Sequence, residues 1–372
     1  MKKLEKGDVM MGKEKSKFSC ISSCMFPGFL FVFLLLIFSI PTYATFSIVA
    51  MDPETEEWGV AVASKVPDVG YVVPWIKPGV GAVATQAYSN PYFGPWALEI
   101  LSKGNSADEV LELILKKDSI PERRQVGIVD NDGKSAAHTG ENTLAWAGHK
   151  TAPFVSVQGN ILTGPEVVDS MFTVFQRTEG PLAERLLRAL EAGENAGGDK
   201  RGKQSAALYV MRKKGGYQGV DDRLVDLKVV DNPEAVGELR RLFEMWKYLF
   251  MAPAYLRLAD EEKDKADVFL KTTYSLLLMA LSSDIKDPEV YNNLAWEFAL
   301  RKKYPEETLQ AAKKAHALAP EEANIMDTLA EAYYVVGDFE KAIYYEKKAL
   351  EKEPNDEFYK KQFKKFEDAL KN

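Results

Sequence analysis

TFSIVAMDPETEEWGVAVAS, residues 45–64, predicts a β-hairpin and sets the frame for the rest of the chain. We expect strands over residues 46–50 and 58–64, because small and β-branched apolar residues dominate both runs. Residues 52–55 between them have the composition of a turn. A third strand is expected over residues 80–87, where many small side chains indicate close packing against another layer.

The segment before this hairpin has the features of a secretory signal. Residues 26–40 are almost wholly apolar and are followed by a short segment that ends at Ala44. Cleavage after Ala44 would make Thr45 the first residue of the mature chain. The alternative is an uncleaved anchor for residues 1–44, although a run of 15 residues is short for a bilayer span of roughly 17–25.

Both alternatives predict the same location. Lysines precede the apolar run, so the remainder of the chain is expected outside the cytoplasm, either secreted or anchored. Contact with a membrane is then expected only through residues 26–40, if they are retained.

Composition narrows the classes of function. Residues 1–44 carry six Lys against three acidic residues, so removing them takes the formal charge from −7 to about −10. An acidic chain of this kind argues against nucleic acid as the main partner. Cys20 and Cys24 both precede the apolar run, and the three His residues lie far apart in sequence. We therefore expect no metal site and no cofactor.

Residues 45–250 mix strands with pairs of helices. Ser106 and Glu109 have the spacing of a capping box, and Asp132-Gly133 is typical of a hairpin turn. Helix pairs inserted between antiparallel strands predict an α+β domain in which two stacked sheets lie between helical layers. Helices are expected over 91–103, 106–117, 165–176, 181–192 and 233–250, and further strands over 124–129, 134–138, 155–160, 204–211 and 224–230.

Residues 254–372 are expected to be wholly helical. Pro320 and Pro354 are 34 residues apart, which is the period of the tetratricopeptide repeat (TPR). The pattern predicts repeats over about 288–320 and 321–354, a capping helix over 356–371 and an additional helical hairpin over 254–283. Such an array favours a protein partner, because stacked repeats form an extended binding groove.

Several blocks of residues 45–245 resemble the DUF1028 family in the same order. They are TFSIVA at 45–50, GVAVAS at 59–64, GVGAVATQA at 79–87, AHTG at 137–140, QGN at 158–160 and GGDKRGKQSA at 197–206. The resemblance implies a four-layer αββα sandwich of the amino-terminal nucleophile (Ntn) hydrolase type. Family members are not tied to one established substrate, and the TPR-like segment is an addition to the family's core.

The resemblance also gives Thr45 a particular significance. Cytoplasmic members of the family typically begin Met-Thr-Phe-Ser, so removal of the initiator Met would leave the equivalent Thr first. Here the expected signal cleavage exposes the same residue. A terminal Thr is a complete catalytic unit, because its hydroxyl is the nucleophile and its own α-amine is the base. The alternative is that Thr45 is only a strand residue with a size that suits signal peptidase.

Two further residues are candidates for catalysis. Asp199 lies in a Gly-rich loop, where a carboxylate would orient the Thr45 amine. Asn160 ends a strand, where its amide would donate to the oxyanion of a tetrahedral intermediate. The alternative for both residues is ordinary hydrogen bonding within loops.

Five residues are candidates for substrate binding. Arg201 would hold a carboxylate with its planar fork, and the other four would contact polar parts of a substrate. For His138 the alternative is a turn-stabilising role. The remaining candidates are Gln86, Asn90 and Gln158.

These residues support two hypotheses of different class. The first is an exported Ntn-type amidohydrolase that cleaves an amide bond of a small molecule or peptide through Thr45. The second is a non-catalytic binding or assembly protein that uses the TPR-like segment for protein–protein interaction. The amino acid sequence leaves the substrate and the oligomeric state open.

Overall fold

The structure is a computed structural model that describes residues 45–371. The signal or anchor expected over residues 1–44 lies outside the described residues. Among the helices that are described, none is both long and apolar enough to cross a bilayer.

Two antiparallel sheets form the first part of the described chain. Within residues 45–371, one sheet has six strands in the order β10-β9-β2-β1-β8-β7, and the other has four in the order β3-β4-β5-β6. The strands of the larger sheet are β1 (Thr45–Asp52), β2 (Glu57–Ser64), β7 (Trp146–Ala152), β8 (Val155–Leu162), β9 (Ser205–Met211) and β10 (Arg223–Val229). Those of the smaller sheet are β3 (Pro74–Lys77), β4 (Gly81–Ala87), β5 (Arg124–Asp130) and β6 (Ser135–Thr139).

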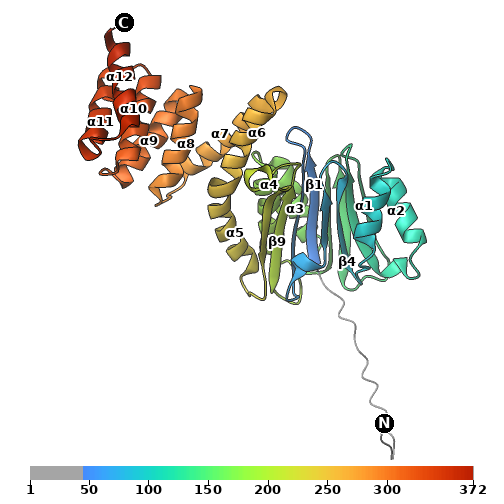
Figure 1. Ribbon diagram of the computed structural model, residues 1–372. Helices are drawn as coiled ribbons and strands as arrows, with labels where there is room; N and C mark the ends of the chain where they lie inside the picture. Colours follow the sequence, from blue (N-terminus) through green and yellow to red (C-terminus); the bar gives the residue numbers. More distant parts are fainter. Residues whose placement is uncertain (1–44, 372) are drawn as a thin grey trace, which may run out of the picture. The chain divides into compact units, whose positions relative to one another are not determined.

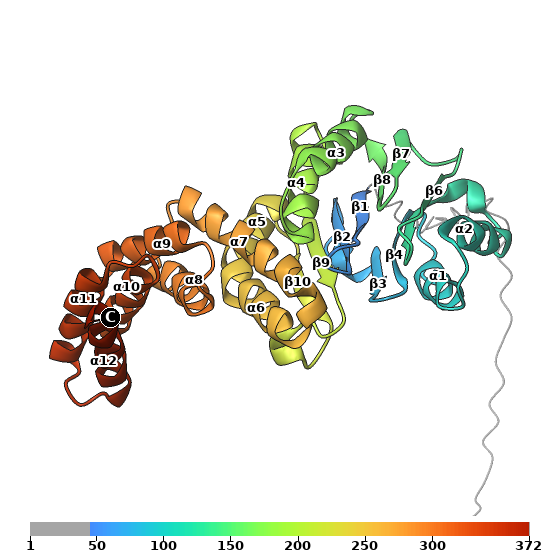
Figure 2. The ribbon, with the colours of Figure 1, turned by 90° about the horizontal axis from the view of Figure 1, so that it is seen from above.

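The two sheets face each other, and helices cover their outer faces. Helices α3 (Glu166–Arg177) and α4 (Leu182–Asn195) pack on β1, β2 and β8, and α5 (Ala235–Trp246) packs on β9 and β10. Helices α1 (Phe93–Leu101) and α2 (Ala107–Lys116) pack on the smaller sheet. Figure 2 shows α1 and α2 on one side of the paired sheets and α3 and α4 on the other. The prediction of an α+β domain with two stacked antiparallel sheets is therefore confirmed.

Alternation along the strands separates the layers of the core. On β1, Phe46 and Ile48 belong to the core beneath α3 and α4, whereas Val49 belongs to the core between the sheets. Successive side chains of a strand point to opposite faces. Thr45 and Ser47 therefore share a face with Val49 and point toward the smaller sheet.

Local signals in the sequence account for most of these elements. Ser106 caps α2, and its hydroxyl and the Glu109 carboxylate form the expected capping box. The hairpin between β5 and β6 turns at Gly133, whose φ of 78° suits glycine. Two edge strands, β3 and β7, were not predicted. The four residues of β3 include Pro74, and β7 contains Gly and Lys and has no buried residue, so neither carries a strong strand signal.

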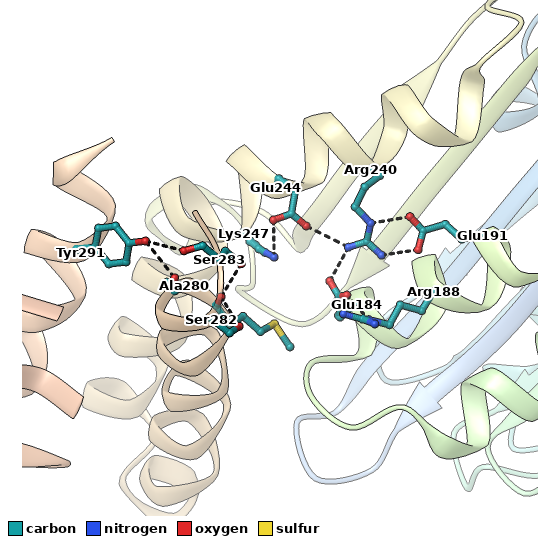
Figure 3. Close-up of polar contacts among 11 residues, drawn as sticks. Glu184, Arg188, Glu191, Arg240, Glu244, Lys247, Ala280, Ser282, Ser283 and Tyr291 are labelled. Atoms are coloured by element: carbon teal, nitrogen blue, oxygen red, sulfur yellow. Dashed lines mark hydrogen bonds and ion pairs between the residues drawn. The ribbon is translucent and has the colours of Figure 1, made fainter. Parts of the chain in front are cut away.

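Helix α5 is fixed to α4 by a cluster of ion pairs. The guanidinium of Arg240 contacts Glu191 at 2.7 and 2.8 Å and Glu184 at 2.8 Å (Figure 3). Lys247, which follows α5, contacts Glu244 at 2.8 Å. Because the Glu184 side chain is almost fully buried, the Arg240 guanidinium compensates a charge that would otherwise be costly in the interior.

The helical segment continues directly from α5. A five-residue π-helical turn, Lys247–Met251, leads into α6 (Ala252–Glu261) and then α7 (Ala266–Ser282). Pro253 follows this turn directly within the continuous helical run, and because proline has no backbone N–H it makes no hydrogen bond to the preceding turn. The side chain of Tyr291 donates to the carbonyl oxygens of Ala280 and Ser283 at 3.2 and 3.1 Å, which fixes the next helix to the end of α7 (Figure 3).

The last five helices of the described chain form the TPR-like array (Figure 1). Its helices form two pairs, over 288–318 and 323–352, and a single helix over 357–371 follows them. At the turn of the second pair, Gly337 has a φ of 82°, as the repeat pattern requires. The equivalent position of the first pair is Lys302, with a φ of 51°. The helices are α8 (Pro288–Arg301), α9 (Pro305–Leu318), α10 (Ala323–Val335), α11 (Phe339–Lys352) and α12 (Glu357–Lys371).

Candidate functional site

Thr45 begins β1 between two hydrogen-bonded neighbours. Across one edge its register partner is Ser64 at the end of β2, and across the other it is Asn160 on β8. The Oγ1 atom of Thr45 lies 3.1 Å from the Oγ atom of Ser64, and all three residues are buried. The antiparallel register therefore gathers a hydroxyl pair and an amide at one end of the inter-sheet space.

Gln86 reaches this position from the opposite sheet. Its Nε2 atom donates to the carbonyl oxygen of Thr45 at 3.2 Å and to Oε1 of Gln125 at 2.8 Å. Gln86 and Gln125 are register partners on β4 and β5, so both side chains point toward β1. Gln86, a predicted substrate-binding residue, therefore lies beside Thr45, and its role in substrate binding stays a prediction.

Gln125 is the centre of the hydrogen-bond network and was not singled out from the sequence. Its Oε1 atom also accepts from Nδ2 of Asn160 at 3.0 Å. Its Nε2 atom donates to Oγ1 of Thr139 and to the carbonyl oxygen of Gly159, each at 2.8 Å. The available signal was a Gln on a strand of otherwise buried residues. That signal does not show which face of the strand packs on the second sheet.

The side-chain amide of Asn160 lies beside Thr45 and is only partly engaged in hydrogen bonds. Besides its bond to Gln125, its Nδ2 atom makes only a long contact of 3.5 Å to the carbonyl oxygen of Thr45. Its Oδ1 atom is buried and has no hydrogen-bond partner among the described residues. One amide hydrogen is therefore held firmly by Gln125, while the second is weakly engaged.

Gln158 lies one register pair further along the sheet. It pairs with Ser47, and its Nε2 atom donates to the Ser47 hydroxyl at 2.6 Å. Ser156 donates to Oε1 of Gln158 at 2.7 Å, and Ser47 donates to Oε1 of Gln86 at 2.7 Å. The side chain of Gln158 therefore contacts Ser47 and Ser156, and its role in substrate binding stays a prediction.

Asp199 fixes the backbone next to Ser64. Its carboxylate accepts from the backbone N–H of Lys65 at 2.8 Å and from the backbone N–H of Arg201 at 2.8 Å. The Arg201 guanidinium pairs with the same carboxylate, with 2.9 Å between Nη2 and Oδ2. The two predicted site residues therefore contact each other. In this geometry Asp199 positions the end of β2, and Arg201 compensates its charge.

Asn90 and His138 are held by contacts away from the Thr45 hydroxyl. The Nδ2 atom of Asn90 donates to Asp118 at 2.6 Å. His138 Nε2 contacts the carbonyl oxygen of Pro121 at 2.9 Å, and His138 pairs with Val126, whose side chain faces α1 and α2. His138 therefore lies on the opposite face of its strand from the network, and its neighbour Thr139 points inward.

A second histidine joins the network instead. The Nδ1 atom of His149, on β7, lies 2.9 Å from Oγ1 of Thr139. Burial lowers the pKa of His149, with a smaller contribution from nearby His138. A neutral imidazole is thereby favoured at this end of the network. The residue was not selected from the sequence because β7 itself was not predicted.

Two cavities flank the Thr45–Ser64 pair. One of 80 Å³ is lined by Thr45 and Gln86 together with the loop between β2 and β3. The other, of 120 Å³, is lined by Ser64 and Asp199 with the Gly-rich loop before β9. Thr45 therefore lines a mostly apolar space between the sheets, and Ser64 also lines a space of mixed character that Phe46 and Ala63 bound on the helix-covered face of the larger sheet. Among the residues that the structure describes, no group of His, Cys, Asp and Glu is arranged to hold a metal ion.

Comparisons with known proteins found a family and a solved structure that match the first part of the chain. The sequence model of a family described as a family of unknown function, DUF1028, matches residues 45–239. The crystal structure of protein SPO2555 from Silicibacter pomeroyi, assigned to the same family, is 29% identical, with a TM-score of 0.50. The match covers 55% of this chain and 89% of that one. A comparison with curated proteins gave no match.

The helical segment gave a weaker likeness. The first TPR of Spaghetti (RPAP3), bound to an HSP90 peptide, is 17% identical, with a TM-score of 0.26. The match covers 32% of this chain and 94% of that chain. At this level the likeness says nothing of what the present chain binds. Its resemblance to a TPR is seen in its own helix pairs and 34-residue period.

Proposed function

The chain belongs to the DUF1028 family, and we propose that it is an exported Ntn-type amidohydrolase with Thr45 as nucleophile. The layered arrangement of helices, two sheets and helices is the one expected for an Ntn-hydrolase-like sandwich. One observation carries the proposal. The Thr45 hydroxyl faces the space between the sheets, 3.1 Å from Ser64 Oγ, at the residue that signal cleavage would expose. The family match also begins at Thr45.

The proposed reaction uses the terminal residue as nucleophile and base. The Oγ1 atom of Thr45 attacks the carbonyl carbon of an amide, and its α-amine takes the hydroxyl proton. The resulting tetrahedral intermediate collapses, the C–N bond breaks, and the α-ammonium returns the proton to the leaving nitrogen. A water molecule, deprotonated by the same amine, then hydrolyses the acyl ester and regenerates the Thr45 hydroxyl.

Neighbouring residues would assist each step. The second N–H of Asn160 is weakly engaged, and we assign it to the developing oxyanion. The Ser64 hydroxyl orients the Thr45 hydroxyl, and Asp199 acts as a positioning residue because it holds the backbone of Lys65 beside Ser64. Gln86 and Gln125 fix the Thr45 carbonyl and the Asn160 amide, which preorganises the site.

Mass spectrometry of the processed chain tests the proposal. The full chain, expressed in a secreting host, is expected to begin at Thr45. That chain should be acylated on its first residue by a hydroxyl-reactive β-lactone, giving one added mass on the amino-terminal peptide. Thr45→Ala should take no label, and Thr45→Ser should retain it. A chain that begins elsewhere, or equal labelling of Thr45→Ala, would contradict the mechanism.

A second candidate function rests on a different cavity. A space of 580 Å³ is lined by residues of α6 and α8, including Leu256, Val290 and Trp296, with several charged side chains around them. Its volume lies within the range of ligand pockets, and its mixed lining offers contacts for both apolar and charged side chains of a peptide. A binding or assembly role would require this surface and would not require a free Thr45. Peptide binding by the wild-type chain that begins at Thr45, without hydrolysis of any amide, would favour this second function.

A further inference from the structure

We propose that the 80 Å³ cavity beside Thr45 is an acyl subsite and that it selects amides of short aliphatic acids, with acyl groups of about four carbons. The inference rests on the proposed hydrolase function and adds the class of substrate to it. The carbonyl of the substrate would lie at the Thr45 hydroxyl, and the alkyl chain would enter the cavity.

The lining of the cavity is mostly aliphatic. Val66, Val69 and Val73 are buried and belong to the core between the sheets, and Val72 packs against that core while half-buried. The polar lining includes Asp68, whose carboxylate is engaged by Lys228 Nζ at 2.6 Å and by the backbone N–H of Tyr71 at 3.1 Å. A charged or strongly polar acyl group would therefore lose hydration there without gaining partners.

The volume sets an upper limit on the chain. A cavity of about 150 Å³ holds a benzene molecule, and this one has 80 Å³. Roughly three carbons beyond the carbonyl would fill the space. Aromatic and long acyl groups would require the cavity wall to move, which packed interiors resist.

The wall is fixed by contacts on both sides. The hydroxyl of Ser205 donates to the carbonyl oxygen of Val66 at 2.6 Å and accepts from the backbone N–H of Val69 at 2.9 Å. The backbone N–H of Thr85 donates to the carbonyl oxygen of Val73 at 3.1 Å. At Gly70 an added Cβ would lie 2.7 Å from the Tyr209 hydroxyl. The loop is thus held closely against both sheets and keeps the cavity small.

The second cavity lies on the helix-covered face of the larger sheet, since Phe46 and Ala63 line it and belong to the core beneath α3 and α4. It is lined by Glu194, Asp199 and Lys203 and by three glycines, so it offers polar side chains and exposed backbone. Ser64 lines this cavity, whereas Thr45 lines the apolar one. Because the larger sheet separates the two cavities, only the apolar one shares the inter-sheet face with the Thr45 hydroxyl, and it alone is assigned to the acyl group.

The test is a chain-length series on the processed protein. N-acylglycinamides with acyl groups from two to eight carbons, and the benzoyl compound, are incubated with the chain that begins at Thr45, and released glycinamide is measured. We expect kcat/KM to be highest near four carbons and to fall about fourfold for each methylene removed. Hexanoyl, octanoyl and benzoyl amides should react at least tenfold more slowly than the optimum.

Variants of the half-buried Val72 test the cavity itself. Val72→Ala should move the optimum to a longer chain, and Val72→Leu to a shorter one. Val80→Ala, at a partly buried valine of the helix-side core, should leave the optimum unchanged. Hydrolysis without chain-length preference, or an optimum that Val72→Ala does not move, would overturn the subsite and leave the hydrolase function standing.

A binding measurement separates the two proposals if no amide is hydrolysed. Saturation-transfer NMR with the Thr45→Ala chain and the same amides should show strongest binding near four carbons, shifted to longer chains by an added Val72→Ala change. That result without hydrolysis by the wild-type chain would support the subsite and contradict the hydrolase. No chain-length-dependent binding together with no hydrolysis would overturn both.

Discussion

Gln86 on β4 donates to the carbonyl oxygen of Thr45 on β1 across 3.2 Å, so a hydrogen bond joins the two sheets at the candidate nucleophile. The same Nε2 atom contacts Gln125, which in turn holds Asn160. The position of Thr45 therefore depends on groups from both sheets. Removing individual members of this network should separate effects on chemistry from effects on stability.

Ser64→Ala should slow the reaction with little loss of stability. The Ser64 hydroxyl lies 3.1 Å from Thr45 Oγ1 and orients it, so its removal should lower kcat or the rate of β-lactone labelling about 10–100-fold. Labelling is followed by intact mass. Ser156→Ala removes another buried hydroxyl of the network that contacts Gln158, and it should leave the labelling rate near that of the wild type. Equal rates for Ser64→Ala and wild type would show that Ser64 does not orient Thr45.

Gln125→Leu should destabilise the α+β domain. The substitution leaves the Gly159 carbonyl and the Asn160 amide without the partners that Gln125 supplies. The expected cost is about 2–4 kcal/mol, seen as a lower urea midpoint. Gln176→Leu, on the exposed face of α3, is the control and should change the free energy of unfolding by less than about 0.5 kcal/mol. A Gln125→Leu chain as stable as the control would rule out a structural role for the network.

We expect the buried carboxyl of Glu57 to make the protein less stable in alkaline solution. Burial raises the pKa of Glu57 to about 8, and the nearby Asp52 carboxylate adds to the shift. The pKa of Glu57 is higher in the folded state than in the unfolded state, so the protonated carboxyl favours folding. This contribution of Glu57 to the free energy of unfolding is complete below about pH 4 and is lost as the pH rises through 8. Glu57→Gln should therefore melt at a higher temperature than the wild type at pH 9, with a smaller difference at pH 5.

The control for this prediction is Glu54→Gln. Glu54 is exposed in the turn of the same hairpin, so its substitution should not alter the pH dependence of the melting temperature. The same pH dependence in wild type and Glu57→Gln would contradict a buried neutral carboxyl at this position.

The TPR-like array contains a second pH-sensitive group. Burial raises the pKa of Glu346 on α11 to about 9, and the neighbouring Asp327 carboxylate on α10 also contributes. The sign is the same as for Glu57, so stability of the array should fall as the pH rises from 5 to 9. Glu346→Gln should flatten this dependence, gaining roughly 1–3 kcal/mol over wild type at pH 9. The stability of the array at each pH is measured by the protection of the α10–α12 backbone amides from hydrogen exchange.

Glu351→Gln provides the matched comparison. Glu351 is exposed on the same helix, and its substitution should leave amide protection with the wild-type pH dependence. If Glu346→Gln loses protection with rising pH as the wild type does, the buried carboxyl is not the responsible group.

Most of the features that could not be predicted from the sequence depend on contacts between distant segments of the chain. A strand over 134–138 was predicted, and in the structure it extends to Thr139. Its inward face was not predicted, because alternation alone does not say which set of side chains meets the second sheet. Asp199 and Arg201 were assigned separate roles from their types, whereas folding of the Gly-rich loop pairs them. Edge strand β7 was missed, and His149 with it.

The sequence by itself determined the local elements, the TPR period and the family blocks that mark Thr45, because these depend on residues close together in the chain. The tertiary structure alone decided that Asn160 is the register partner of Thr45 and that Gln86 and Gln125 reach the same position from the opposite sheet. These relationships join residues 35 to 115 positions apart. They arise only when strand register and the packing of one sheet on the other are fixed together, so no local pattern of residues specifies them.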